Sequence, residues 1–284
     1  MNQAGLKRLN TSQLSPQDRQ QRNQRNKIAK SVRYAFKPAW TLNALLRRSL
    51  SALNVAHDCG DAVDFALHPA WVQECLGQRL VLQIPLEKIR FHMADWLELG
   101  DRRLHTSDYF LAYGDLVPAR YEMSRLPVLR EVQELMAAGW QCEHTPTYAQ
   151  LVKAMEQQRP VVRQQIRLDS LEKIQAYFQR FHALHASVAQ HGVLSNKEVA
   201  QKLGLESDRE IGIALDRDGA VVKLHGGKHR FALAVAHQLK TIPVELRMVH
   251  AQALSEVCLT RGCSPVQAIV WLVKNLESNL EHRV

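Results

Sequence analysis

The chain has 284 residues, 46% of them hydrophobic and 23% charged, so it can bury one or two cores and is not disordered throughout. Its formal net charge of +9 is concentrated at one end, because the first 48 residues hold eleven Lys and Arg against a single acid, Asp18. No run approaches the ~18 apolar residues of a membrane span, and no apolar leader precedes a cleavage site. We expect a cytoplasmic protein, with peripheral attachment at the inner membrane surface as an alternative.

The five cysteines are scattered, and no Cys-x-x-Cys motif is present. An odd number of dispersed thiols does not form a disulfide framework or a zinc knuckle. We therefore expect free thiols at Cys59, Cys75, Cys142, Cys258 and Cys263.

The N-terminal region divides into a tail and a helical segment. Residues 1–30 are rich in Gln, Asn and Arg, and we predict a basic disordered tail over 1–38. An amphipathic helical segment is predicted over 39–75, because leucines 42, 45, 46, 50 and 53 fall at helical spacing opposite Arg47 and Arg48. Three interpretations compete: a helix docked on its own domain with a solvated basic face, a segment lying on anionic lipid, and an arm that binds nucleic acid.

The central region starts with a strand and continues with helices. The β-rich run 79–89 is interrupted by Pro85, which predicts a strand entering a short turn. Residues 105–122 show no clear periodicity and are expected to form a structured loop. Helices are predicted over 128–138 and 147–157, and a longer one follows an Asp169-Ser170 cap and ends at Gly192.

The last third returns to strand patterns. Residues 210–216 and 220–224 flank an Asp-Arg-Asp-Gly turn signal, which predicts a β-hairpin rather than a calcium loop, since the later Glu of such a loop is missing. A helix is predicted from Lys228, and a further strand over 242–248. Ser264 and Pro265 then open a closing amphipathic helix in a C-terminal helical region, 251–284.

The turn between the hairpin and the helix at Lys228 carries the chemistry. A helix N-terminus exposes backbone N–H groups and about half a positive charge, and a glycine pair lets the backbone approach a ligand closely. Gly226 and Gly227 are followed at once by Lys228, His229 and Arg230. Arg230 can grip oxygens bidentately, Lys228 supplies a mobile point charge and His229 can donate, so the natural guest is a phosphate.

These residues resemble a known superfamily. The run from Gly226 through Ala234, followed by Leu239-Lys-Thr-Ile-Pro-Val244, is similar to the nucleotide-binding core of the ParB/sulfiredoxin superfamily, and 79–89 resembles its first strand. A longer pattern resembles an uncharacterised ParB-like family and covers roughly 79–250. It includes Gly114-Asp115, the segment around Gly139-Trp140, Asp218-Gly219 and a closing His250.

The resemblance implies an α+β fold, with a small mixed β-sheet core over 76–250 and a helical insertion at about 123–200. It also implies that Gly226, Gly227, His229 and Arg230 cradle nucleotide phosphates. Two departures matter. Lys228 stands where sulfiredoxins place the reactive Cys, which argues against sulfinic-acid reduction, and Gly226 stands where ParB-like relatives usually have Asp. Residues 195–204 only superficially resemble the start of a helix-turn-helix.

The leading hypothesis is an enzyme that transfers phosphate from ATP or CTP, with Mg²⁺, to a small hydroxylated acceptor, with surface-glycan metabolism suggested by analogy alone. Glu87, Glu210 and Asp216 are the candidate proton acceptors, in that order. The alternative is a ParB-like, nucleotide-gated DNA-binding or regulatory protein without turnover. Besides the nucleotide and the small-molecule acceptor, the candidate partners are an anionic membrane surface or nucleic acid, contacted through residues 1–48. His182 and His185, three apart on a helix, are interpreted as packed or surface histidines rather than metal ligands.

Overall fold

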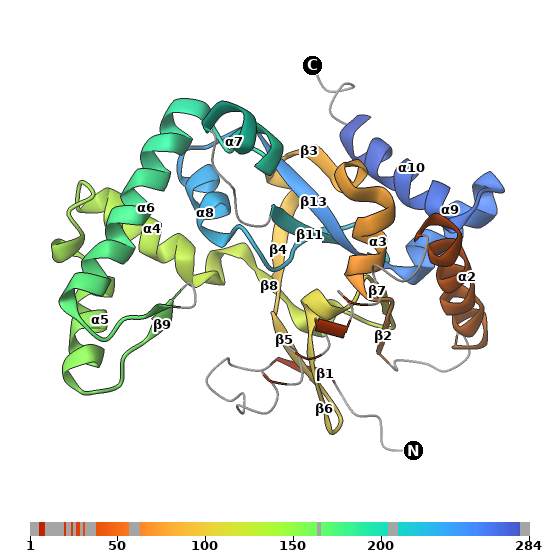
Figure 1. The fold of residues 1–284 in the computed structure, drawn as a ribbon, viewed down its shortest axis with the longest axis horizontal. Coiled ribbons are helices and arrows are strands. Elements are labelled where there is room, and N and C mark those ends of the chain that lie inside the picture. The colour runs from red at the N-terminus through yellow and green to blue at the C-terminus, as the bar shows by residue number, and fades with distance from the viewer. Residues whose placement is uncertain are drawn as a thin grey trace. The chain divides into compact units, whose positions relative to one another are not determined.

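The computed structural model describes residues 6–8, 38–56, 63–163, 166–203 and 210–278, together with positions 20, 24, 27, 28 and 31. The protein is α+β, as predicted, and forms two compact units (Figure 1). Unit 1 comprises residues 1–123, 209–226 and 243–284, and unit 2 comprises residues 124–208 and 227–242.

A mixed sheet forms the centre of unit 1. Its strands are, in spatial order, β2 (Asp64–Ala66), β7 (Leu111–Tyr113), β13 (Thr241–His250), β11 (Ile211–Leu215), β12 (Val221–Lys223), β4 (Ile89–Met93) and β8 (Arg120–Glu122), and β3 (Val81–Pro85) also pairs with β13. β11 is parallel to β13 and antiparallel to β12, which is parallel to β4. Every residue of β11 is buried, as is every residue of β13 after Thr241, which is typical of strands covered on both faces.

A second, antiparallel sheet contains β1 (Leu6–Arg8), β5 (Trp96–Leu99) and β6 (Arg102–His105). Leu97, Leu99 and Leu104 join a core cluster against which Leu6 packs. The prediction of a disordered tail is therefore wrong for residues 6–8, because an apolar anchor and strand pairing hold them. Apart from these residues, the five single positions and Pro38, which begins α2, the predicted tail lies outside the described residues.

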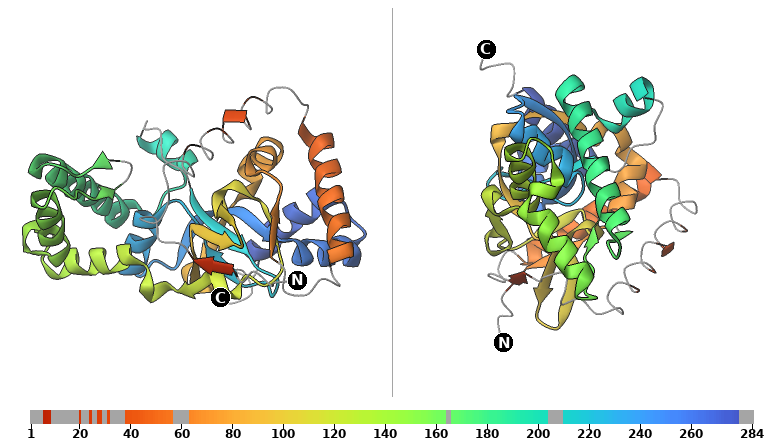
Figure 2. Two further views of the ribbon diagram at one scale, coloured as in Figure 1. Left: turned by 90° about the horizontal axis from the view of Figure 1, so that it is seen from below. Right: turned by 90° about the vertical axis from the view of Figure 1, so that its left-hand side faces the viewer.

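Four helices of the described chain flank the sheet of unit 1: α2 (Pro38–Ala56), α3 (Pro69–Leu76), α9 (Ala251–Arg261) and α10 (Pro265–Ser278). α2 packs against the other three, and the left view of Figure 2 shows it beside α9 and α10. Leu42 and Leu46 are fully buried whereas Arg47 and Arg48 are exposed, so the leucine stripe is used for docking on unit 1. No helix of the described residues is long and apolar enough to cross a membrane.

Unit 2 is mainly helical. Its helices are α4 (Pro127–Ala137), α5 (Pro146–Glu156), α6 (Leu171–His191), α7 (Asn196–Leu203) and α8 (Lys228–Ala236), with a short hairpin of β9 (Val162–Arg163) and β10 (Ile166–Arg167). α8 packs on α4 and α6 and buries Phe231, Ala232, Leu233 and Ala234. The Ser170 side chain caps α6 and Gly192 follows its last residue, which confirms the predicted limits of this helix.

The structure also shows where the predictions of local structure hold and fail. The hairpin is confirmed, since the amide of Asp216 donates to Ala220 across its turn. The structured loop at 105–122 is wrong in part, because it contains β7 and β8. A three-residue strand is too short to show alternation, and all of β7 is buried. The structure also divides the chain differently, since 39–75 and 251–284 belong to the same unit as the sheet, and α8 belongs with the helices of 124–208.

Candidate functional site

The turn at residues 224–227, called the glycine turn below, links β12 to α8. Gly226 has φ +84°, and Gly227 is left-handed at φ 59° and ψ 24° with no side chain capping the helix. The first helical hydrogen bond runs from the amide of Phe231 to the carbonyl of Gly227, 2.9 Å. The helix therefore begins where the sequence predicted, and both glycines adopt backbone conformations that side chains disfavour.

Two buried cations lie beneath this turn in unit 1. The ammonium of Lys223, which is 0% exposed, donates to the carbonyls of Leu224 and Gly226. The guanidinium of Arg247 donates to the carbonyl of His225 at 3.2 Å and to that of Glu210 at 2.9 Å. Three successive carbonyls, 224 to 226, thus accept hydrogen bonds from cationic side chains.

This arrangement fixes the direction of the amides as well. In a trans peptide the N–H of each residue points opposite to the carbonyl of the residue before it. The N–H of Gly226 is therefore directed away from Arg247, and the N–H groups of His225 and Gly227 are directed away from Lys223. In the described part of the chain, the amides of Gly226 and Gly227 donate no hydrogen bond. Two adjacent backbone donors thus have no partner in the described part of the chain.

Arg247 needs both a partner and space to occupy this position. Its partner is Glu245, two residues earlier on the same face of β13, with Nε to Oε2 at 2.7 Å and Nη2 to Oε2 at 2.6 Å. The space comes from two glycines. A Cβ on Gly226 would lie 2.6 Å from Nη1 of Arg247, and one on Gly212 would lie 2.4 Å from the carbonyl of His225. Glycine is thus required at both positions by close approach.

The predicted side-chain donors that follow the turn belong to unit 2. Arg230 directs Nη1 to the carbonyl of Leu194 at 3.2 Å and to Asn196 Oδ1 at 3.4 Å. His229 turns its ring onto Phe181, edge to face at 4.7 Å between centroids, and its Nε2 lies 3.2 Å from the Tyr177 hydroxyl. Both side chains therefore contact unit 2 itself, and the donors of the turn that have no partner in the described part of the chain are the backbone amides of Gly226 and Gly227.

His229 ends a buried polar chain. The Tyr177 hydroxyl, on α6, donates to Oε1 of Glu131, on α4, at 2.8 Å. Its oxygen then accepts from His229, which requires the neutral ring to carry its proton on Nε2. Burial lowers the pKa of His229 to about 4, with smaller contributions from the cations Arg163 and Lys228. Burial also raises the pKa of Glu131 and that of Tyr177, so the chain favours neutral forms.

The structure separates the three acids predicted from the sequence. Glu210 lies at the open end of the hairpin beside the glycine turn, where its carbonyl is 3.0 Å from the position of a Cβ on Gly226, but its side chain is buried. Asp216 lies at the hairpin tip, roughly 20 Å further along β11 at ~3.3 Å per residue. Glu87 precedes β4, which starts level with Val221 near the same tip. Only Glu210 is brought to the turn.

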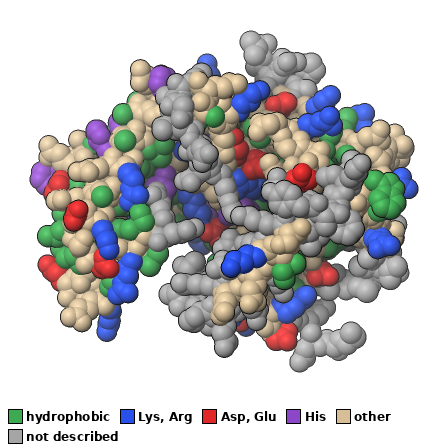
Figure 3. Space-filling view, in the orientation of Figure 1, with side chains coloured by type: hydrophobic (Ala, Val, Ile, Leu, Met, Phe, Trp, Pro, Cys, Tyr) green, Lys and Arg blue, Asp and Glu red, His purple; other side chains and the backbone are tan. Residues whose placement is uncertain are grey.

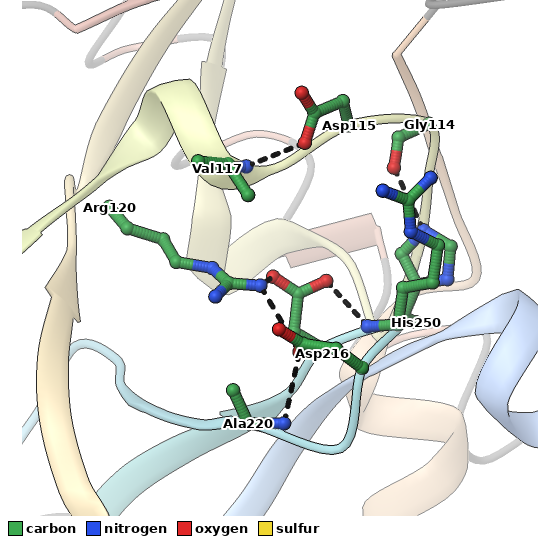
Figure 4. Close-up of polar contacts among 9 residues, drawn as sticks. Gly114, Asp115, Val117, Arg120, Asp216, Ala220 and His250 are labelled. Carbon is green, nitrogen blue, oxygen red and sulfur yellow. Dashed lines mark hydrogen bonds and ion pairs between the residues drawn. The ribbon is translucent and has the colours of Figure 1, made fainter.

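Asp216 instead belongs to a polar cluster at the hairpin tip (Figure 4). It forms an ion pair with Arg120 of β8, and both side chains are less than a tenth exposed. Arg120 also lies 3.4 Å from Asp218. Nearby, His250 Nε2 donates to the carbonyl of Gly114 at 2.9 Å, and its Nδ1 accepts from the amide of Gln252, which caps α9. The scattered motif residues 114, 115, 218 and 250 therefore converge within unit 1, in a cluster with clear structural roles.

Of the predicted histidine pair, His185 is partly buried and His182 is exposed. His185 stacks on Trp140 at 3.7 Å and on His237 at 5.0 Å between centroids. Among the described residues, no group of three or more His, Cys, Asp and Glu side chains could hold a metal ion. The described cysteines, Cys75, Cys142, Cys258 and Cys263, are free thiols, and Cys59 lies outside the described residues.

Sequence reasoning missed Lys223, Glu245 and Arg247. A signal for the last two was present, because opposite charges two residues apart in an otherwise apolar strand share one face and can pair. Comparisons of the chain with family models, with curated proteins and with solved structures find no match. The functional interpretation therefore depends on the geometry of the turn and on the resemblance seen in its sequence.

Proposed function

We propose that the protein binds a nucleotide through its phosphates, and that the amides of Gly226 and Gly227 are the principal donors. The observation that carries this proposal is the fixation of carbonyls 224 to 226 by Lys223 and Arg247, which leaves two preorganised amides without a partner in the described chain. The N-terminus of α8 adds positive potential at the same point. The resemblance of the motif to the ParB/sulfiredoxin core supports a nucleotide, ATP or CTP, over a simple anion.

Phosphoryl transfer to a small hydroxylated acceptor is the activity we propose for this site. Such a transfer needs positioned phosphates, charge stabilisation and a group that accepts the proton of the acceptor hydroxyl. The amides of the glycine turn position the phosphates, and Mg²⁺ arriving with the nucleotide would share the phosphate charge. Glu210 is the proposed proton acceptor, because it alone of the three predicted acids lies beside the turn.

A second candidate is nucleotide binding without turnover, in a ParB-like DNA-binding or regulatory protein. It is favoured by the placement of the acids, since Glu87 and Asp216 lie at the hairpin tip and the Glu210 side chain is only 4% exposed. A protein that only binds nucleotide needs no proton acceptor. The basic residues before position 48 would then contact DNA through its phosphates.

The binding proposal is tested by following the amide resonances of Gly226 and Gly227 during titration with ATP and with CTP, each with and without Mg²⁺. Binding through these amides predicts that both resonances shift and saturate together. Gly219 and Gly262, which also have positive φ and lie in other turns, are the internal controls and should not move. If the two resonances stay in place while another part of the chain binds nucleotide, the proposed cradle is wrong.

Turnover separates the two candidate functions. Release of nucleoside diphosphate in the presence of hydroxylated acceptors, lost in Glu210→Gln with nucleotide affinity retained, supports the transferase. Nucleotide binding without release, combined with a DNA shift that depends on salt and disappears on deletion of residues 1–48, supports the regulatory protein.

A further inference from the structure

The face of α2 opposite the docked leucines is exposed and carries a large aromatic residue beside cations. Trp40 is 83% exposed, and Arg47, seven residues later, lies on the same helix face. Arg48 is also exposed. Because Leu42 and Leu46 are fully buried, this orientation of the helix is fixed, and the leucine stripe cannot itself face a partner.

α9 extends the same surface. Leu259 is 79% exposed, on a helix that packs against α2. At the end of α9 the guanidinium of Arg261 lies 3.9 Å from the ring centroid of Trp271 on α10. Trp40, Arg47, Arg48, Leu259 and Arg261 are called the α2/α9 surface below.

The charge of this surface is one-sided. α2 contains no acid, and α9 contributes one, Glu256. In the sequence, the 37 residues that precede α2 hold nine Lys and Arg against one acid. Figure 3 shows hydrophobic and Lys or Arg side chains adjacent to one another over α2 and α9, at the right of the view.

We propose that the α2/α9 surface binds an anionic membrane surface, with Trp40 and Leu259 inserted at the headgroup boundary and the arginines on lipid phosphates. A nucleic acid would satisfy the arginines but offers little to an exposed leucine. A headgroup boundary accommodates both, because an aromatic ring settles at the interface and an aliphatic side chain gains by leaving water. Each arginine near such a surface contributes about 1 kcal/mol, or roughly fivefold in partitioning.

The test is co-sedimentation of the full chain with phosphatidylcholine vesicles, with and without phosphatidylserine, at low salt. We expect binding only to vesicles containing phosphatidylserine. It should weaken by more than about twenty-five-fold in Arg47→Glu/Arg48→Glu, because the loss of two arginines alone accounts for two factors of about five, and about fivefold in Leu259→Ser. Trp40→Phe should retain most of the binding that Trp40→Ala loses. Arg180→Glu, an exposed arginine on α6 of unit 2, is the matched control and should bind as the native chain does.

Three results would overturn the proposal. Binding that survives both Trp40→Ala and Leu259→Ser would show that the basic residues before α2 act without the folded surface. Equal binding to neutral vesicles would exclude headgroup recognition. Binding to duplex DNA with none to vesicles would identify nucleic acid as the partner. Circular dichroism of each variant separates loss of binding from loss of folding.

Discussion

His229 should make the stability of unit 2 sensitive to acid. Its ring is packed against Phe181 and Tyr177, and burial lowers its pKa to about 4 from an ordinary value of 6.5. The unfolded chain therefore binds a proton in a pH range where the folded chain does not. The stabilising contribution is complete above pH 6.5 and is lost as the pH falls through 4.

The size of this contribution follows from the two values. A difference of about 2.5 pKa units, at about 1.4 kcal/mol per unit, corresponds to about 3 kcal/mol of unfolding free energy. Glu131 has the opposite effect on stability in acid, because burial raises the pKa of its carboxyl and protonation then removes a buried charge. Comparison with a variant that lacks only the imidazole isolates the contribution of His229.

The assay is urea unfolding between pH 7 and 4, followed by far-ultraviolet circular dichroism, for the native chain and His229→Gln. The native chain should lose about 3 kcal/mol more than the variant over this range. The pKa of His229 can be measured independently from its ring nitrogen shifts. A folded-state value near 6.5, or parallel pH profiles for the two proteins, would refute the view that this ring is buried and neutral.

Three further substitutions test other parts of the structure by urea unfolding at neutral pH. Tyr177→Phe should cost about 1 to 3 kcal/mol of unfolding free energy, because the buried carboxyl of Glu131 then loses its hydrogen-bond donor, the Tyr177 hydroxyl. Tyr148→Phe, which also removes a hydroxyl next to Phe178, should cost less than half as much. Gly226→Ala should destabilise the protein more than Gly219→Ala. Both glycines have positive φ, but of the two only a Cβ at 226 would meet another atom, Nη1 of Arg247 at 2.6 Å. Equal losses of stability would contradict this close approach. Arg120→Leu should cost about 3 to 5 kcal/mol by leaving Asp216 buried and unpaired, and Arg120→Leu/Asp216→Asn should recover part of that loss, which a purely steric effect would not permit.

Local signals in the sequence were sufficient to predict the elements whose ends are marked by capping or turn residues. Ser170 and Gly192 limit α6 by capping, and Asp216 to Gly219 close the hairpin, so both could be predicted from a few residues. β7 and β1 could not, because three residues carry no readable alternation and their stability comes from pairing with distant strands. The N-terminus of α8 was predicted for the same reason as α6, from the glycines before it.

The sequence likewise predicted only part of the candidate site. The turn itself was visible as a glycine pair before cations, but the direction of its side chains depends on neighbours distant in sequence. His229 is turned by Tyr177 and Phe181 of α6, 48 to 52 positions earlier in the chain. The three acids were ranked from the sequence alone, with Glu87 first. The strand register contradicts this ranking, because β4 and β12 run parallel and place Glu87 at the far end of the hairpin.

The buried cations give the strongest reason to assign function to the glycine turn. Removing a Lys or an Arg from water is expensive unless the charge is fully hydrogen bonded, and a tight turn needs no cation beneath it. Lys223 and Arg247 meet that requirement with the turn's own carbonyls and, for Arg247, with Glu245. Such an arrangement costs stability if the turn serves only as a connection. It is advantageous where amides must keep one direction before a ligand arrives, since the reorganisation is then completed during folding rather than during binding.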